Sequence, residues 1–178
     1  MPEGFATDYT VTPNKFVTGI TWFVIIMFLV MATIIPVVIY ITERHLLATF
    51  GFIALILSVF IPTLLLSWAY SPQKYEVTDE KITIVRPRNP IVIPLAKIIK
   101  VEPKDFKAHK LMRKWGNGGL FSITGKFWSK SEGNFWCYGK NDNYVMLHAD
   151  KKWVVTPDDK EIFIQDVRSK VERARKKR

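Results

Sequence analysis

Three basic residues, Lys81, Arg86 and Arg88, lie in a short stretch of alternating polar and apolar residues. The alternation predicts short strands joined by turns, which would place the three cations on neighbouring strands. Ammonium and guanidinium groups in such an array can hold the clustered oxygens of phosphate groups. The alternative is a solvated basic face that rests on anionic lipid. We expect this contact with lipid headgroups rather than a phosphoinositide pocket.

A second basic segment runs from Pro103 to Trp115 and is predicted to form a short helix. One face would be apolar and the other mostly basic, formed respectively by Ala108, Leu111, Met112 and Trp115 and by Lys104, Lys107, Lys110 and Lys114. Such a helix could lie in a membrane interface, or its apolar face could pack on the rest of the chain. The candidate residues for binding lipid or a partner in this segment are Lys107, Lys110, Arg113, Lys114 and Trp115.

Glycines at positions 116, 118, 119 and 125 follow this segment, but they do not form a phosphate-binding loop. Five residues separate Gly119 from Gly125 where such a loop has four, and Phe127 stands in place of its Ser or Thr. We expect these glycines to permit a turn or bulge with positive φ.

The remaining reactive side chains form no catalytic pattern. His45, His109 and His148 are scattered, without the spacing of a metal site or of a nucleophile and its base. Cys137 is the only cysteine, which fits a reducing compartment and predicts a small buried apolar side chain. We therefore expect no enzyme activity, no cofactor and no metal.

Two apolar stretches, Phe16 to Tyr40 and Leu46 to Tyr70, precede all of these residues and contain no Asp, Glu, Lys or Arg. About 20 apolar residues in a helix suffice to cross a bilayer, and the rest of the chain is too small to enclose two such helices. The first 14 residues lack the basic start of a signal peptide. The sequence predicts a transmembrane hairpin over residues 16–70, and the absence of charge inside it makes a channel or transporter a weak hypothesis.

The hairpin has a predicted orientation because its connection is only five residues long, which places both ends on one side of the membrane. Basic residues near the membrane are Lys15, Lys74, Lys81, Arg86 and Arg88 on the side of the ends, against Arg44 in the connection. The positive-inside rule then predicts that both termini are cytoplasmic. Trp22 and Trp68 should lie near the cytoplasmic interface.

Small residues recur at helical spacing on the second stretch, at Ala48, Gly51, Ala54 and Ser58. Small side chains let helix backbones approach closely within a membrane. We expect this stripe to pack on the first helix.

Residues 71–178 are strongly basic, because all but Lys15 and Arg44 of the 26 Lys and Arg residues lie there. Strands are predicted at Tyr75–Thr78, Lys81–Arg86, Ile91–Leu95, Ile98–Glu102, Leu120–Ile123, Asn134–Tyr138, Tyr144–His148 and Lys152–Val155. Thr156 and Pro157 predict the start of a C-terminal helix over about 157–176, with Thr156 as its N-cap.

A set of residues spread over this basic part forms a recognisable pattern: Tyr75–Ile82, Arg113–Phe121, Gly125–Phe127, Gly133–Phe135, Tyr138, Asn141, Thr156–Asp159 and Phe163. With these residues the chain resembles a bacterial family with a pleckstrin-homology-like (PH-like) domain. The resemblance implies a split barrel capped by one helix, a fold used for binding phosphoinositides, peptides or proteins, and it implies no reaction. Lys81, Arg86 and Arg88 also look like the basic pattern that grips inositol phosphates in some PH domains.

The sequence as a whole predicts an α+β membrane protein. It would comprise an N-terminal cytoplasmic segment (1–15), a transmembrane hairpin (16–70) and a cytoplasmic PH-like domain (71–178), a small antiparallel barrel or split barrel with a C-terminal capping helix. We expect a non-catalytic binding or scaffolding protein of a bacterial plasma membrane, which contacts anionic phospholipid, an unidentified protein, or both. The alternative is an accessory subunit assembled through the hairpin. Nucleic acid is not an expected partner, because no nucleic-acid-binding pattern accompanies the charge.

Overall fold

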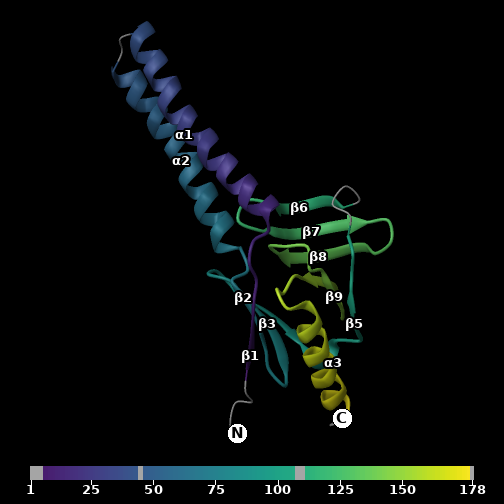
Figure 1. The fold of residues 1–178 in the computed structure, drawn as a ribbon. Helices are drawn as coiled ribbons and strands as arrows, with labels where there is room; N and C mark the ends of the chain where they lie inside the picture. The colour runs from purple at the N-terminus through teal and green to yellow at the C-terminus, as the bar shows by residue number, and fades with distance from the viewer. Residues whose placement is uncertain (1–5, 44–45, 107–110, 177–178) are drawn as a thin grey trace.

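The computed structural model describes residues 6–43, 46–106 and 111–176. Two long helices, α1 (Lys15–Glu43) and α2 (Leu46–Ala69), lie side by side and project together from the β-rich remainder (Figure 1). At 1.5 Å per residue they are about 43 and 36 Å long, enough to cross a hydrocarbon core of about 30 Å. The predicted pair of long apolar helices is confirmed, with ends within three residues of those expected.

The contact between α1 and α2 is made by large side chains. The rings of Phe28 and Phe60 stack with their centroids 4.0 Å apart, and Ile56 is buried beside them on the same face of α2. Gly51, Ala54 and Ser58 are exposed, and nothing lies within 4 Å of a Cβ placed on Gly51. The prediction that the small residues pack on α1 is therefore wrong for these three, because bulky residues on another face of α2 form the contact. The side chain of Ala48 lies outside what the structure describes.

The β-rich part contains two separate sheets. The first is antiparallel, in the order β1 (Thr7–Thr10), β2 (Lys74–Val77), β3 (Lys81–Val85) and β4 (Ile91–Pro94). The second has the order β5 (Lys100–Pro103), β9 (Val145–His148), β10 (Lys152–Val155), β8 (Gly133–Gly139), β7 (Ile123–Ser129) and β6 (Met112–Gly118). A 3-10 turn, η1 (Leu95–Lys97), connects the sheets.

The prediction was an antiparallel barrel or split barrel, and this arrangement excludes the closed barrel and the purely antiparallel pairing. The sheets do not close into one barrel, and β10 pairs with β8 in parallel. The parallel pair arises because the β9–β10 hairpin folds back and inserts β10 between β9 and β8. The predicted sequence of β-structure followed by a C-terminal helix, α3 (Lys160–Lys176), is confirmed.

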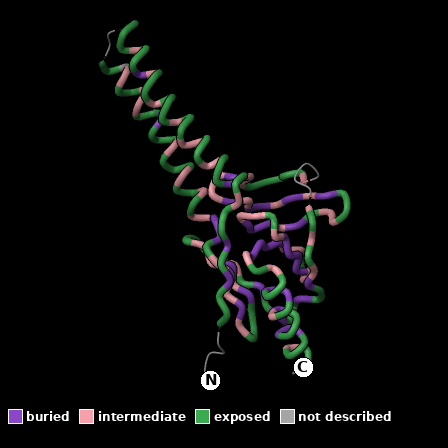
Figure 2. The backbone as a smooth tube through the Cα atoms, in the orientation of Figure 1, coloured by how far each residue is buried: buried purple, intermediate pink, exposed green. Residues whose placement is uncertain are grey.

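Helix α3 closes the main core, and Figure 2 shows that buried residues recur along the strands of both sheets. Phe163 and Val167 of α3 are fully buried against Tyr75, Ile82 and Ile84 of the first sheet. A second cluster lies within the larger sheet and includes Cys137, as expected from its sequence. Burial raises the pKa of the Cys137 thiol to about 12, so this thiol is unreactive at neutral pH.

The N-cap predicted for α3 is wrong. The helix begins at Lys160, and the Thr156 hydroxyl instead accepts a hydrogen bond from the backbone N–H of Lys140 at 2.9 Å. Thr156 is fully buried in this position. Its role is to join the end of β10 to the loop after β8.

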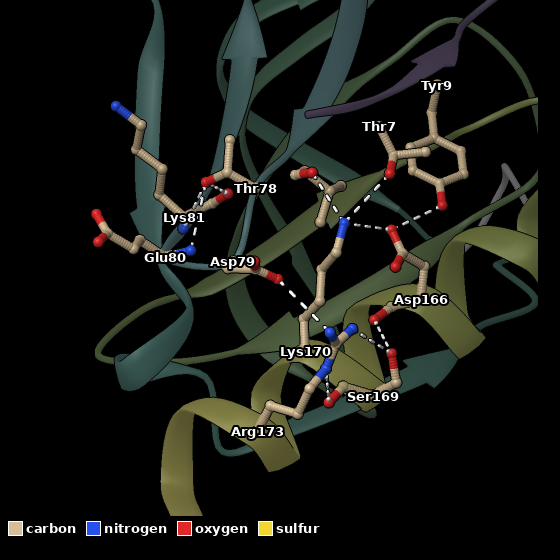
Figure 3. A network of polar contacts seen from close by, with 11 residues as sticks. Thr7, Tyr9, Thr78, Asp79, Glu80, Lys81, Asp166, Ser169, Lys170 and Arg173 are labelled. Atoms are coloured by element: carbon tan, nitrogen blue, oxygen red, sulfur yellow. Dashed lines mark hydrogen bonds and ion pairs between the residues drawn. The ribbon is translucent and has the colours of Figure 1, made fainter. Parts of the chain in front are cut away.

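The N-terminal segment was not predicted to have regular structure, yet residues 7–10 form β1 along the edge of β2. A polar network holds this strand against α3 (Figure 3). The Lys170 ammonium, 6% exposed, donates to Asp166 Oδ2 at 2.9 Å, to the Val77 carbonyl at 3.0 Å and to Thr7 Oγ1 at 3.2 Å. Tyr9 donates to the same Asp166 oxygen at 2.9 Å. These bonds satisfy the charges of Lys170 and Asp166, so the network is structural.

Candidate functional site

The two long helices meet the β-rich part through direct contacts at both of their near ends. At the start of α1, the Asn14 side chain caps the helix by accepting from the Val17 N–H at 2.9 Å. The same side chain donates to Asp142 at 2.8 Å, and the Asn14 N–H donates to the Lys140 carbonyl at 2.9 Å. The start of α1 is thus bonded to the loop between β8 and β9.

The turn between β6 and β7 contacts the side of α1. Asn117 shapes this turn by accepting from the Leu120 N–H at 3.1 Å. The Phe121 N–H donates to Thr21 Oγ1 at 2.9 Å. Gly119, at φ 145°, lies so close that a Cβ there would be 2.8 Å from the Ile20 side chain. A side chain at this position would push the turn away from α1.

The end of α2 is held in the same way. The Ala69 carbonyl accepts from the Arg88 N–H at 3.0 Å, and the Ser71 hydroxyl donates to the Phe121 carbonyl at 3.3 Å. The β-rich part therefore contacts both helices directly and is not joined to them by the connecting chain alone.

A pocket of about 600 Å³ opens in the corner between α2 and the outer strands of the larger sheet. One face of α2 forms one wall, and β6, β7 and Arg86 form the other. The lining residues are Thr63, Leu66, Ser67, Tyr70, Arg86, Arg113, Trp115, Gly116, Asn117, Leu120, Thr124, Gly125 and Tyr138. Its volume falls in the usual range of ligand sites, about 300–1,000 Å³.

The first cation of the pocket, Arg86, lies between two aromatic rings. Its guanidinium carbon is 5.5 Å from the centroid of Tyr70 and 5.3 Å from that of Tyr138, distances typical of cation–π contacts. Burial lowers the pKa of Arg86, yet a guanidinium stays charged in a protein. Its Nε and Nη2 donate to the Asn89 carbonyl, and it forms no ion pair with any described carboxylate. Arg86 is therefore a half-buried positive charge, and its remaining N–H groups have no hydrogen-bond partner among the described residues.

The second cation, Arg113, extends from β6 and packs across Gly118. Within the described ranges it has neither a hydrogen bond nor an ion pair. Trp115, on the same strand, is 70% exposed and also lines the pocket, as does Leu66 of α2. The pocket thus combines two uncompensated cations with aromatic and apolar walls.

The glycines shape this corner, and their predicted positive φ is confirmed at Gly116, Gly119 and Gly125. Gly116 and Gly125 face each other across β6 and β7, where a Cβ on Gly125 would collide with the Trp115 carbonyl. A bulge between Arg113 and Trp115 shifts the register of β6 beside this pair.

The structure brings only some of the predicted site residues together. Arg86, Arg113 and Trp115 meet at the pocket. Arg88 lies beside it, 5.8 Å from the Tyr70 ring. Lys81 is the first residue of β3 and Arg86 directly follows the last, so the two lie about 17 Å apart along the strand at about 3.4 Å per residue. The turn before Lys81 contacts α3 instead, through Asp79 and Arg173 at 3.9 Å (Figure 3). The three cations of the first hairpin therefore do not form one cluster.

The segment predicted as an amphipathic helix is largely a different structure. Met112 to Gly118 form β6, so the helix is wrong there, and Lys114 is exposed on this outer strand. Lys107 and Lys110 lie outside the described residues. Leu120–Ile123, predicted as a strand, forms most of the turn into β7. Sequence reasoning did not assign Tyr70 and Tyr138 to the site, because nothing in the local pattern shows that both rings meet Arg86.

A separate cluster of charges, around Glu102, is paired throughout. Glu102 contacts Lys100 at 2.6 Å, His148 at 2.8 Å and Lys104 at 3.0 Å, and Lys104 continues to Glu132 at 2.6 Å. Hydrogen bonds from Lys100 and then Lys104 lower the pKa of Glu102 to about 2. No group of three potential metal ligands occurs within the described ranges.

Two β-sheets sealed by a C-terminal helix form an architecture of the PH-like class. The family described as bacterial PH domain matches residues 73–171, and the chain belongs to this family. The match runs from the start of β2 into α3 and leaves out α1, α2 and β1. No curated protein and no solved structure shows significant similarity to the chain. PH-like domains are generally non-catalytic binding modules.

Proposed function

We propose that this protein is a membrane-anchored binding module, in which α1 and α2 cross the bilayer and hold the PH domain against its cytoplasmic surface. There the domain contacts anionic phospholipid and presents itself to a protein partner. The observation that carries the proposal is the direct bonding of the domain to the near ends of both helices, at Asn14, Thr21 and Ala69.

The surfaces of the two helices support insertion into lipid. In the most apolar 18-residue stretch of each helix, only 6% of the residues of α1 and 11% of those of α2 are buried. In a core helix of a soluble protein most residues would be buried. Large side chains such as Phe23 and Leu47 are 67% and 89% exposed. Exposed apolar surface is unfavourable in water by about 25 cal/mol per Å², and a bilayer removes that penalty.

Indole groups support the depth of the proposed insertion. Trp22 and Trp68 are exposed on the helices near the domain, and Trp115 is exposed on β6. Tryptophan prefers the boundary between hydrocarbon and water. With the boundary at these three residues, the pocket lies at headgroup level, and the excess of basic residues beside it favours the cytoplasmic side of a bacterial plasma membrane.

The topology is tested by labelling single cysteines in intact cells, in a Cys137→Ala background. Thr42→Cys lies at the far end of α1, and Ser131→Cys lies in the turn between β7 and β8. A membrane-impermeant maleimide should label the first variant in intact cells and the second only after the membrane is opened. Equal labelling of both in intact cells would reject the proposed orientation, and release of the protein by alkaline carbonate would reject insertion.

A second candidate function is an accessory subunit of a larger membrane complex. It is favoured by the face of α2 that carries Gly51, Ala54 and Ser58, which points away from α1 and so stays open to another helix. Affinity purification in mild detergent separates the two functions when the hairpin is replaced by an unrelated one. Partners lost with the hairpin favour the subunit, whereas partners retained favour the PH domain as the binding element.

A further inference from the structure

The pocket between α2 and β6 lies along the side of a membrane-length helix. Thr63, Leu66, Ser67 and Tyr70 recur at helical spacing, so they line it from a single face of α2 and of the turn that directly follows it. Seven residues of helix correspond to about 10 Å along the axis. If Tyr70 marks the headgroup level, the wall formed by Leu66 and Thr63 reaches the depth of the first acyl carbons.

The charge in the pocket has a single sign. Arg86 and Arg113 both line it, and no described carboxylate pairs with either. Two of the hydrogen-bond donors of Arg86 are used by the Asn89 carbonyl, and its other N–H groups have no hydrogen-bond partner among the described residues. An occupant should therefore bring negative charge to the mouth of the pocket and apolar surface to the wall on α2.

We propose that this pocket binds one anionic phospholipid, with its phosphate at Arg86 and Arg113 and the start of an acyl chain against Leu66. The inference rests on the membrane insertion proposed above and adds a specific site to it. A single lipid of this kind meets both requirements of the pocket, its positive charge and its apolar wall beside α2. One wall of the pocket belongs to α2 and the other to the PH domain, so the bound lipid would also connect the helix to the domain.

The test uses the full chain in phosphatidylcholine vesicles that contain a minor fraction of phosphatidylglycerol. After transfer to mild detergent, mass spectrometry of the intact protein counts the phosphatidylglycerol molecules retained per chain. The double variant Arg86→Gln, Arg113→Gln should retain at least about tenfold less, because it removes two charge-assisted contacts. Leu66→Trp, which fills the apolar wall and leaves both arginines, should also reduce retention.

The matched control is Lys126→Gln, Lys151→Gln, which removes the same charge from a separate depression beside β8. It should retain phosphatidylglycerol like the unaltered chain. Thermal unfolding of each variant verifies that it is folded, and a second pair, Arg86→Lys and Arg113→Lys, should recover part of the binding because the charge returns.

The inference is wrong if both double-Gln variants lose lipid equally, since surface charge alone would then explain retention. It is also wrong if Leu66→Trp has no effect, since the pocket would then hold an anion without an acyl chain. Unchanged retention in every variant would likewise overturn it and leave the pocket to another occupant, such as a peptide. Each of these outcomes leaves the anchored module intact, whereas failure of the unaltered chain to float with vesicles removes both proposals.

Discussion

The hydroxyl of Tyr75 joins the first sheet to the part of the second sheet that supports the pocket. Tyr75 is fully buried, and its hydroxyl donates to the Tyr138 carbonyl at 2.6 Å and accepts from the Thr156 N–H at 3.1 Å. Tyr75→Phe removes one oxygen and leaves two buried backbone groups without that partner. Each unsatisfied group costs about 1–3 kcal/mol, so we expect Tyr75→Phe to lower the free energy of unfolding by about 3 kcal/mol.

The matched control is Tyr144→Phe. Tyr144 is also buried, but its hydroxyl makes only a long contact of 3.4 Å with Asp142. Melting of the detergent-solubilised chain, followed by near-UV circular dichroism, should show a Tm lower by roughly 10 °C for Tyr75→Phe and a much smaller change for the control. Equal changes for the two variants would refute the importance assigned to the buried hydroxyl.

Three further predictions concern other parts of the fold. Lys170→Met should speed hydrogen exchange of Thr7–Thr10, because β1 loses the ammonium that joins it to Asp166; unchanged exchange would argue against this anchor. Gly125→Ala should unfold the β6–β7 hairpin, since φ 132° and the nearby Trp115 carbonyl leave no room for a Cβ. A near-UV circular dichroism spectrum identical to that of the unaltered chain would contradict this. The pKa of Glu102 is lowered in the folded state to about 2 from 4.5, so its contribution to stability is present above pH 4.5 and falls as pH drops toward 2. In Glu102→Gln the melting temperature should therefore depend less on pH over that interval. The same dependence of Tm on pH in the variant and the unaltered chain would count against the ion-pair cluster.

Composition was enough to predict the two helices. An uninterrupted apolar stretch has few alternatives to a helix of membrane length, and α1 and α2 follow the predicted ranges closely. The packing between them was not predictable from the small residues, because the faces in contact are chosen by large side chains such as Phe28 and Phe60.

The strands were predictable where alternation was clear, as at β3 and β10. Strand β6 was missed because its glycines and its helix-like spacing of apolar residues gave the wrong period, and only pairing with β7 makes it a strand. Strand β1 has four residues, and its partner β2 lies more than 60 residues later in the chain. Local sequence carries little information about such a pair.

The candidate pocket was predictable only in part. Arg86, Arg113 and Trp115 were all singled out, the arginines by their charge and Trp115 by its place in the predicted amphipathic helix, but they lie in two separate segments. Their meeting depends on how the first sheet and the β6–β7 hairpin pack beside the end of α2, which the local sequence does not show. The role of Tyr70 likewise follows from the tertiary structure, because its ring stacks on a guanidinium from another element.

The central claim is that the PH domain is fixed against the membrane with Trp115 at headgroup level. Quenching of tryptophan fluorescence by phospholipids brominated at different acyl positions tests it directly, with Trp115 isolated as the difference between the unaltered chain and Trp115→Phe. If the domain is fixed in this way, this difference is quenched most by bromine close to the headgroup and is shielded from aqueous iodide. A Trp115 contribution that iodide quenches fully and brominated lipid leaves unchanged would place β6 in water and contradict the account.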